Sequence, residues 1–502
     1  GRGFNVGITN LAFSPLCQNA RLPEAAATDS SSWQPVHIHE YIGPENVQSV
    51  TGISVRTSQT KTQPPLFSIL LPSRNRLALL KFAVESVMAQ SVGSWEIVVS
   101  DNCSDDDYRG YFSVIERARI RVVRTQTAVP VTDNWNNALA HATGRYVIML
   151  GDDDALTFGC LARLKTLITE HAEPDVIFSA AYHYCYPGAM AAKPDGYLAT
   201  VVPLPALEGY TKPALLPDGK GRYFAEQSLK FRNLFGFNSQ YMVWKKSFID
   251  SLVHLGPFFQ SPYPDYYSSA VTMRLAKRVV MSPDPAMVIG ISPKSFGYFF
   301  AKNEAPAGNA MLGLTEAYAD TVRAVLPGAA HALDLPGDPH YRNWLIANLT
   351  VYRNLPEAFE QGVDLRRYRR VQILWMAHHY HTDPLAERRK IAQAVAGLSP
   401  REQRFFDRLC WQFQQAKRAK EPLQALHDKL FSAMNIYGGA RVEFHEFGLH
   451  ADVRDALAWL SVRSDPVRRF LQHIPRQLRA RQRRSGRARR FGDTNQFLSK
   501  FR

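Results

Sequence analysis

Cysteine is scarce in this sequence. The 502 residues include five cysteines, an odd number, and no two of them stand in a CxxC arrangement. This pattern argues against a disulfide framework and against a zinc site, and it fits a reducing compartment. No apolar run approaches the roughly 18 residues that span a bilayer, and the opening GRGFNVGITNLAF lacks the apolar core of a signal peptide. These absences predict a cytoplasmic protein.

Two glycine-rich phosphate motifs are also missing. No GxGxxG follows the first apolar strand segment, so the dinucleotide-binding fingerprint is absent. No GxxxxGK[ST] occurs either, which argues against a P-loop NTPase. Any phosphate site in this chain must therefore be built from other residues.

Length and charge divide the chain. A chain of 502 residues is too long for one compact core, so two or three domains are expected. The net charge is +15, but residues 463–502 alone hold 13 Lys and Arg against 2 Asp. We predict four parts: an N-terminal extension, an α/β domain, an α-helical domain and a basic amphipathic tail, at residues 1–63, 64–302, 303–460 and 461–502.

The second part shows an α/β rhythm. Short apolar segments, typical of buried strands, alternate with segments whose apolar residues recur at helical spacing. Such alternation predicts a mainly parallel sheet flanked by helices. The expected strands are 66–72, 95–101, 120–124, 145–150 and 175–180, and the expected helices between them are 76–91, 106–118, 132–144 and 158–172.

The apolar strand segment RYVIML runs into a glycine and three carboxylates, Asp152, Asp153 and Asp154. The carboxyl edge of a parallel sheet is where open α/β folds bind ligands. Three adjacent carboxylates repel one another, and a hard divalent cation bound to a phosphate is the usual compensation. A solvated Asp-rich turn is the alternative interpretation of this stretch alone.

Two other strand segments end in polar residues at the same expected edge. Asp101 and Asn102 can exchange hydrogen bonds with a base or ribose, although an ordinary N-capping turn is the favoured explanation when this stretch is taken alone. The first strand ends in Pro72-Ser73-Arg74-Asn75, where Arg74 can add positive charge. The agreement of three strand ends favours a binding site.

The ordered set FSILLPSRNR, WEIVVSDNCSDDD and NWNNALAHATGRYVIMLGDDDAL resembles the family 2 glycosyltransferases, which have the GT-A nucleotide-diphosphosugar fold. The resemblance covers residues 66 to about 295. It implies an α/β GT-A sheet and a nucleotide-diphosphosugar donor. It implies donor contacts from strand ends and from the helix before the fourth strand: Pro72, Ser73, Asn75, Asp101, Asn102 and Asn134.

By the same resemblance, Asp152–Asp154 match the family's DxD-type motif, which holds Mg²⁺ or Mn²⁺ on the diphosphate. The common form has Asp where this chain has Gly151, so the choice of the two metal-binding carboxylates stays open. Apart from the resemblance, the segment 279–297 is expected to supply closing strands. Its Ser292, Lys294 and Ser295 are favoured as part of an ordinary loop, and a loop near the diphosphate is the alternative.

Asp265 opens an apolar-periodic helix in PYPDYYSS. It can act there as a helix cap. It can also act as a general base, because sugar transfer to an alcohol requires removal of the hydroxyl proton. In the resembling family an Asp at a helix start occupies this slot, which implies an inverting displacement. Asp284 and Glu226 are the weaker candidates.

The sequence thus predicts a metal-dependent, inverting glycosyltransferase acting on a saccharide or lipid-linked acceptor in bacterial surface polysaccharide synthesis. A nucleotidyltransferase and a non-catalytic scaffold are the alternatives. The first usually has a Gly-rich basic loop after its first strand, which PSRNRLALL does not provide. The intact Asp cluster and Asp265 weigh against the second.

Beyond residue 305 the pattern becomes helical. His378, His379 and His381 suggest a metal site, but adjacent histidines do not share a helical face, so packing or surface roles are expected. The basic tail, with apolar residues on one stripe, suits an anionic inner membrane surface, which would place the protein peripherally there. A solvated tail is the alternative. Nucleic acid is the least favoured partner because the tail has few aromatic residues to stack on bases.

Overall fold

The structure, a computed structural model, describes residues 63–115, 119–189, 195–202, 205–301, 305–314, 330–434, 443–450 and 452–461. The predicted N-terminal extension, except its last residue, and the basic tail, except its first, lie outside these residues. From Pro65 on, the described residues belong to one compact unit.

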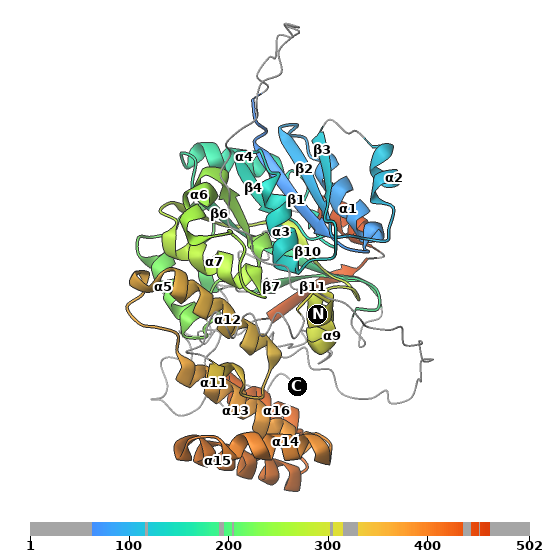
Figure 1. The fold of residues 1–502 in the computed structure, drawn as a ribbon. Coiled ribbons are helices and arrows are strands. Elements are labelled where there is room, and N and C mark those ends of the chain that lie inside the picture. Colours follow the sequence, from blue (N-terminus) through green and yellow to red (C-terminus); the bar gives the residue numbers. More distant parts are fainter. Residues whose placement is uncertain are drawn as a thin grey trace, which may run out of the picture. The chain divides into compact units, whose positions relative to one another are not determined.

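Four parallel strands form one half of the central sheet (Figure 1). In the order β3-β2-β1-β4 they are Ile120–Arg124, Trp95–Asp101, Phe67–Ser73 and Tyr146–Met149. Every residue of β1 and β4 is buried, as their uninterrupted apolar sequences predict. In the β1–β2 register, Ser73 stands opposite Asp101, so the polar strand ends lie side by side.

The other half of the sheet is mixed. β9 (Met242–Lys245) runs antiparallel between β4 and β6 (Val176–Cys185). β10 (Val279–Ile291) lies parallel to β6, with a register shift between Ser282 and Met287. The remaining strands are antiparallel to their neighbours: β5 (Ala155–Leu156), β7 (Tyr197–Val202), β8 (Ala214–Leu215) and β11 (Glu443–Leu449).

Residues 181–221 are rich in Tyr, Pro and Ala, and this composition predicts a long excursion between sheet elements. The structure differs in the first part of this stretch: β6 continues to Cys185, and β7 returns beside it as an antiparallel strand. The tyrosines of this stretch explain the difference, because aromatic residues favour strands. Tyr184 is buried there in a small cluster with Leu198.

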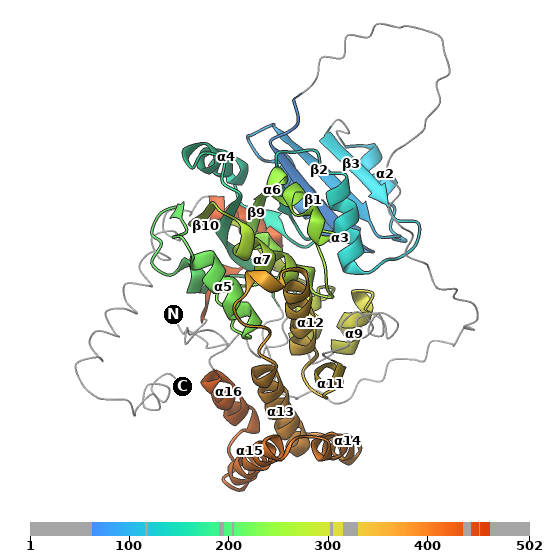
Figure 2. The ribbon, with the colours of Figure 1, turned by 60° about the vertical axis from the view of Figure 1, so that its left-hand side comes forward.

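Helices cover the sheet in the predicted alternation (Figures 1 and 2). Those connecting the first strands are α1 (Leu77–Met88), α2 (Tyr108–Ser113), α3 (Val131–Ala140) and α4 (Cys160–Glu170). Those following β8 are α5 (Lys220–Leu229), α6 (Lys246–Ser251) and α7 (Pro264–Leu275), and the short 3₁₀ turn η3 (Ser239–Tyr241) precedes β9. The predicted fold class, an α/β sheet flanked by helices and followed by a helical region, is confirmed.

The helical region begins after β10. Its elements are α8 (Phe296–Ala301), α9 (Ala305–Met311), α11 (Ala330–Leu333), α12 (Pro339–Asn354), α13 (Leu365–Thr382), α14 (Leu385–Ala396), α15 (Pro400–Arg418) and α16 (Leu423–Ala433). Trp344 of α12 is 1% exposed and packs against Phe231, Phe237 and Tyr266 of the α/β part. The two parts therefore share one hydrophobic core. Among the described residues, no helix is both long and apolar enough to cross a bilayer.

The chain then returns to the sheet. β11 pairs antiparallel with β7, so residues 443–449 form a strand within the range expected to be helical. The helix over residues 453–461 packs Val453, Ala456 and Leu460 against the cluster of Tyr184. Its Arg454 forms an ion pair with Glu85 of α1 at 2.6 Å. Residues 443–461 thus belong structurally with the α/β part.

Candidate active site

The Asp152–Asp154 turn lies at the carboxyl end of β4, beside the end of β1. All three carboxylates are buried, with exposed fractions of 1%, 6% and 2%. Ser73 donates its hydroxyl to Asp152 Oδ2 at 2.6 Å, and the same hydroxyl lies 2.6 Å from the Tyr108 hydroxyl. The predicted meeting of the first and fourth strand ends is therefore present.

Arg76 is the cation of this cluster. Its Nε lies 3.1 Å from Asp152 Oδ2, and its Nη1 lies 3.6 Å from Asp153 Oδ2. Nη1 is buried and forms no hydrogen bond with any described residue. A buried guanidinium nitrogen that lacks a hydrogen-bond partner is suited to donate to an anionic ligand. Arg74, the arginine expected from the sequence, is exposed instead.

The three aspartates differ in what they contact. Asp154 accepts hydrogen bonds at both oxygens, from Gly151 N and Gln240 Nε2 at Oδ2 and from Gly290 N at Oδ1, at 2.6, 2.8 and 2.7 Å. These contacts make Asp154 the carboxylate that holds the turn together. Asp152 and Asp153 share the guanidinium of Arg76 instead.

The loop after β10 lies against this turn, which is the less favoured of the two sequence interpretations. Ser292 donates its hydroxyl to Asp153 Oδ2 at 2.8 Å, and its own N–H donates to the Ser295 hydroxyl. Lys294 is exposed and donates to the Asn75 carbonyl at 3.3 Å. This segment therefore connects the Asp turn to the loop that follows β1.

Burial dominates the electrostatics of the turn. It raises the pKa of Asp152, against the opposing charge of Arg76 and with the help of Asp153. Burial and the charge of Asp153 likewise raise the pKa of Asp154. Bare carboxylates are therefore costly here, and a cation that joins them would lower the pKa of both.

A divalent cation fits the donor set of Asp152 and Asp153. Both offer hard oxygen ligands, and their Oδ2 atoms converge on one cationic group, Arg76. Mg²⁺ commonly binds through one or two carboxylates together with substrate phosphates. Among the described residues no group of three or more His, Cys, Asp or Glu could hold a metal ion, so a phosphate or water ligand would complete the shell.

Asp265 is joined to the same site by η3. The Ser239 N–H donates to Asp265 Oδ1 at 2.9 Å, and the next residue, Gln240, donates to Asp154. Asp265 lies in the first turn of α7 and is partly exposed. Burial raises its pKa from 3.8 to about 6. A carboxylate with this pKa can accept a proton near neutral pH.

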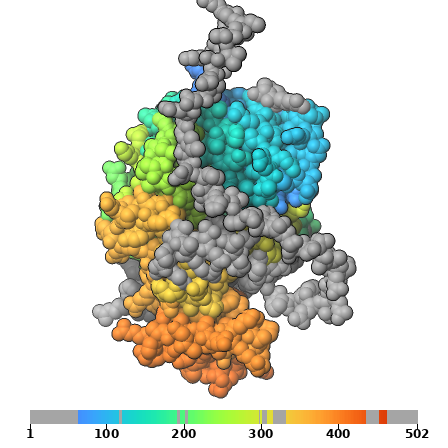
Figure 3. All heavy atoms as spheres, in the orientation of Figure 1, coloured from blue at the N-terminus to red at the C-terminus, as the bar shows by residue number. Residues whose placement is uncertain are grey.

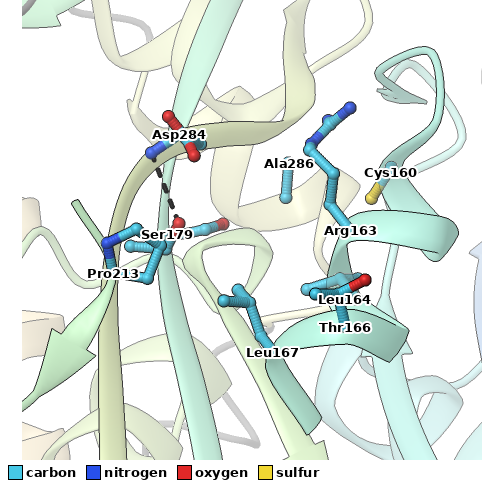
Figure 4. A pocket seen from close by; sticks show the side chains of 10 residues that line it. Cys160, Arg163, Leu164, Thr166, Leu167, Ser179, Pro213, Asp284 and Ala286 are labelled. Atoms are coloured by element: carbon cyan, nitrogen blue, oxygen red, sulfur yellow. Dashed lines mark hydrogen bonds between the residues drawn. The ribbon is translucent and has the colours of Figure 1, made fainter. Parts of the chain in front are cut away.

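The weaker candidates for the base lie elsewhere. Asp284 lines a separate pocket of about 260 Å³, together with Arg163 and Leu167 of α4 and Ser179 of β6 (Figure 4). Glu226 forms an ion pair with Arg222 of its own helix. No hydrogen bond or ion pair connects either residue to the Asp turn within the described part of the chain.

The predicted nucleoside-contacting residues occupy two loops. Asp101 accepts hydrogen bonds from Arg124 and from the Ser104 N–H, at 2.6 and 2.9 Å. Asn75, with a φ of 52°, exchanges hydrogen bonds with Asp105. These loops lie at the ends of the adjacent strands β1 and β2. Pro72 is buried within β1.

Two predicted residues have mainly internal contacts. Asn102 pairs with both the N–H and the carbonyl of Val129, each at 2.8 Å, and so fixes the loop before α3. Asn134 is buried and accepts the Ser100 hydroxyl at 2.6 Å. Their contact with a donor stays a prediction.

Sequence reasoning missed Arg76 and Gln240. Arg76 stands in the same PSRNR loop as Arg74, and its position directly before α1 is the one signal that favoured it. Gln240 lies in FNSQY, which carries no motif. Only the folded chain shows that η3 reaches the Asp turn.

Comparison with known proteins gives a family match, three relatives and a similar solved structure. Residues 68–212 match the family model described as glycosyl transferase family 2. Over 118 residues the chain is 32% identical to a PGL/p-HBAD biosynthesis glycosyltransferase of Mycobacterium bovis, covering 23% of this chain and 46% of that protein. Over 109 residues it is 35% identical to the GalNAc(5)-diNAcBac-PP-undecaprenol beta-1,3-glucosyltransferase of Campylobacter jejuni, covering 21% and 35%.

A third relative is the putative teichuronic acid biosynthesis glycosyltransferase TuaG of Bacillus subtilis, 37% identical over 92 residues, with 18% of this chain and 36% of that protein covered. The chain thus spans less than half the length of each of these relatives. Among solved structures, S. aureus TarS 1–349 in complex with UDP-GlcNAc is 14% identical, with a TM-score of 0.37 over 71% of this chain and 92% of that one.

Proposed function

We propose that the protein is a metal-dependent, inverting glycosyltransferase. The match of residues 68–212 to the glycosyl transferase family 2 model supports this proposal. The proposed donor is a nucleotide diphosphosugar, and the proposed acceptor is a saccharide or lipid-linked saccharide used in bacterial surface polysaccharide synthesis. One observation carries the proposal. Asp152 and Asp153 converge on the guanidinium of Arg76 beside the ends of β1 and β4, and η3 links Asp265 to the same turn.

In this proposal the strand ends bind the donor. Asp101 and Asn75 face the nucleoside. Nη1 of Arg76, which forms no hydrogen bond within the described residues, meets the diphosphate. A Mg²⁺ or Mn²⁺ bound by Asp152 and Asp153 supplies neutralising charge to the diphosphate. Ser73 holds Asp152 in place, and Ser292 holds Asp153. Asp154 keeps the turn closed.

Asp265 acts on the acceptor. The acceptor oxygen forms a bond to the anomeric carbon as the bond from that carbon to the phosphate oxygen breaks. The bonding pair leaves with the nucleoside diphosphate, and the acceptor's proton passes to Asp265. Because attack and departure occur on opposite faces of the sugar, the anomeric configuration inverts.

A thermal-shift screen of nucleoside diphosphates with and without Mn²⁺ tests the donor site. A ligand at about 100 times its Kd stabilises the fold by about 2.7 kcal/mol. Wild type and an Asp218→Ala control, altered at an exposed carboxylate, should show a metal-dependent shift with one nucleotide. Asp153→Ala should lose that shift. No shift with any nucleotide would refute the proposed donor.

Metal-dependent hydrolysis of a nucleotide sugar without acceptor tests catalysis separately. A transferase should release free sugar slowly, whereas a non-catalytic scaffold should release none. The NMR-determined anomeric configuration of the product tests inversion, because a retained configuration excludes the single displacement assigned to Asp265.

A further inference from the structure

Helix α15 presents a basic stripe to solvent. Arg401, Arg404, Arg408, Trp411 and Arg418 recur at spacings of three, four, three and seven residues, which places them on one face of the helix. All five are exposed, and the exposed fraction of Trp411 is 61%. We call this set the Trp411 face. Figure 3 shows the surface of these C-terminal helices in orange.

The opposite side of α15 is buried, and its packing keeps the Trp411 face exposed to solvent. Phe406, Leu409 and Phe413 are buried in the shared core, where α15 packs against α13. Glu402 at the start of α15 accepts two hydrogen bonds from Arg369 of α13, at 2.6 and 3.1 Å. The helix therefore cannot rotate to bury Trp411 without breaking its own packing.

The arginines of the Trp411 face are not used within the fold. Within the described residues, none of the four arginine side chains forms an ion pair or a hydrogen bond. Asp407 is the acidic residue on the same exposed side, so the face keeps a net positive charge. Four exposed guanidinium groups around one exposed indole form a basic surface whose charge suits an anionic partner.

The chemistry of the face suits a lipid headgroup layer. An indole has an apolar ring and a polar N–H, and tryptophan is enriched at the membrane–water interface. Arginines beside it meet lipid phosphates, and basic residues near a bilayer are attracted by anionic lipids. A single convex helix with one aromatic ring offers neither a groove for a nucleic acid backbone nor a row of rings for bases.

We propose that the Trp411 face docks this protein on an anionic lipid bilayer, with the indole inserted at headgroup level and the arginines on lipid phosphates. This interaction is separate from the donor site and does not depend on the proposed transferase activity. It also differs from the basic tail, since the Trp411 face belongs to a packed helix of the folded unit.

Vesicle binding by the full chain tests this proposal. Vesicles of phosphatidylcholine alone are compared with vesicles of equal parts phosphatidylcholine and phosphatidylglycerol, by cosedimentation. The test variants are Trp411→Ala and the double change Arg404→Gln/Arg408→Gln. The matched control, Arg121→Gln/Lys165→Gln, removes the same charge from exposed residues of β3 and α4. The tail is intact in every variant.

Wild type and control should bind the anionic vesicles and not the neutral ones. The arginine double variant should bind at least tenfold more weakly, because each basic residue near an anionic surface contributes about fivefold to the affinity. Brominated lipid should quench wild-type tryptophan fluorescence, and Trp411→Ala should lose that quenching while its unfolding midpoint is unchanged.

Equal binding by all variants would overturn the proposal and assign any membrane affinity to the tail. Binding of the same variants to a single-stranded oligonucleotide is measured in parallel. If the arginine double variant lost oligonucleotide binding while its vesicle binding was unchanged, the proposal would be overturned in favour of a nucleic acid partner. Neither result depends on a sugar donor, so failure here is distinguishable from failure of the proposed transferase.

Discussion

Replacing Asp265 with Asn should stabilise the protein while abolishing its activity. Burial raises the pKa of Asp265 from 3.8 to about 6, so the ionised group is less stable in the folded protein than in the unfolded chain. A shift of about 2 units corresponds to ~3 kcal/mol at 1.36 kcal/mol per unit. The helix N-terminus favours a negative charge by ~0.3–1 kcal/mol, which Asn forfeits. Asn keeps an oxygen for the Ser239 N–H, so the net gain expected is ~2 kcal/mol.

The stability difference between Asp265→Asn and wild type should depend on pH. Between about pH 4 and 6 the folded protein holds a proton on Asp265 that the unfolded chain has released, so the free energy of unfolding falls as the pH rises. Above pH 6 the full cost of ionising Asp265 in the folded protein is present. Below pH 4 both states are protonated, and Asp265→Asn should show no gain over wild type.

Urea unfolding of both proteins at pH 7.5, 5 and 4 measures this difference. The gain should be largest at pH 7.5 and close to zero at pH 4. A less stable variant at pH 7.5, or a gain that does not change with pH, would refute the burial argument.

The same variant tests the assigned base. Loss of a general base typically lowers kcat by about 10²–10⁴-fold, whereas donor binding in the thermal-shift screen should not change. Wild-type activity should decline as the pH falls below about 6. An Asp265→Asn variant with wild-type kcat would exclude Asp265 as the base.

Three further substitutions test the structure. A Cβ on Gly290 would lie 1.9 Å from the Asp153 carbonyl oxygen, so Gly290→Ala should displace the Asp turn and lower activity at least tenfold, measured as transfer rate, with ~1–3 kcal/mol lost in stability. Trp344→Ala should cost ~3–5 kcal/mol in urea unfolding, and a loss below ~1 kcal/mol would contradict the shared core. Glu402→Gln should lose ~1–2 kcal/mol at pH 7, because hydrogen bonds from Arg369 lower the pKa of Glu402 from 4.5 to about 2. That difference should persist above pH 4.5 and vanish as the pH falls through 2.

The sequence predicted the parallel half of the sheet closely because its signals are local. The expected strands 95–101 and 120–124 match β2 and β3, and 66–72 is offset by one residue from β1. Uninterrupted apolar runs bounded by turn residues leave little choice of structure. The helix expected at 106–118 ends at Ser113 as α2, since its boundary depends on packing rather than on periodicity.

The site was only partly predictable for a related reason. Motif position pointed to the Asp turn, Ser73 and Asp265, which follow strands or begin helices and which the structure connects by hydrogen bonds. Arg76 and Arg74 are chemically identical and two residues apart, and the backbone between them decides which one turns inward. Gln240 reaches Asp154 across 86 residues of sequence, which no local pattern records.

The pairing of β7 with β11 has a consequence for how the chain folds as it is made. Val202 stands opposite Glu443, 241 residues later in the sequence. At about 5–20 residues per second, synthesis of that interval takes roughly 10–50 s. During this time the backbone N–H and C=O groups of β7 that pair with β11 have no partner strand. An unpaired edge strand can pair with another chain instead. A fragment that ends after the helices but before residue 443 would retain this open edge permanently, so the sheet is completed only by a segment that leaves the ribosome late.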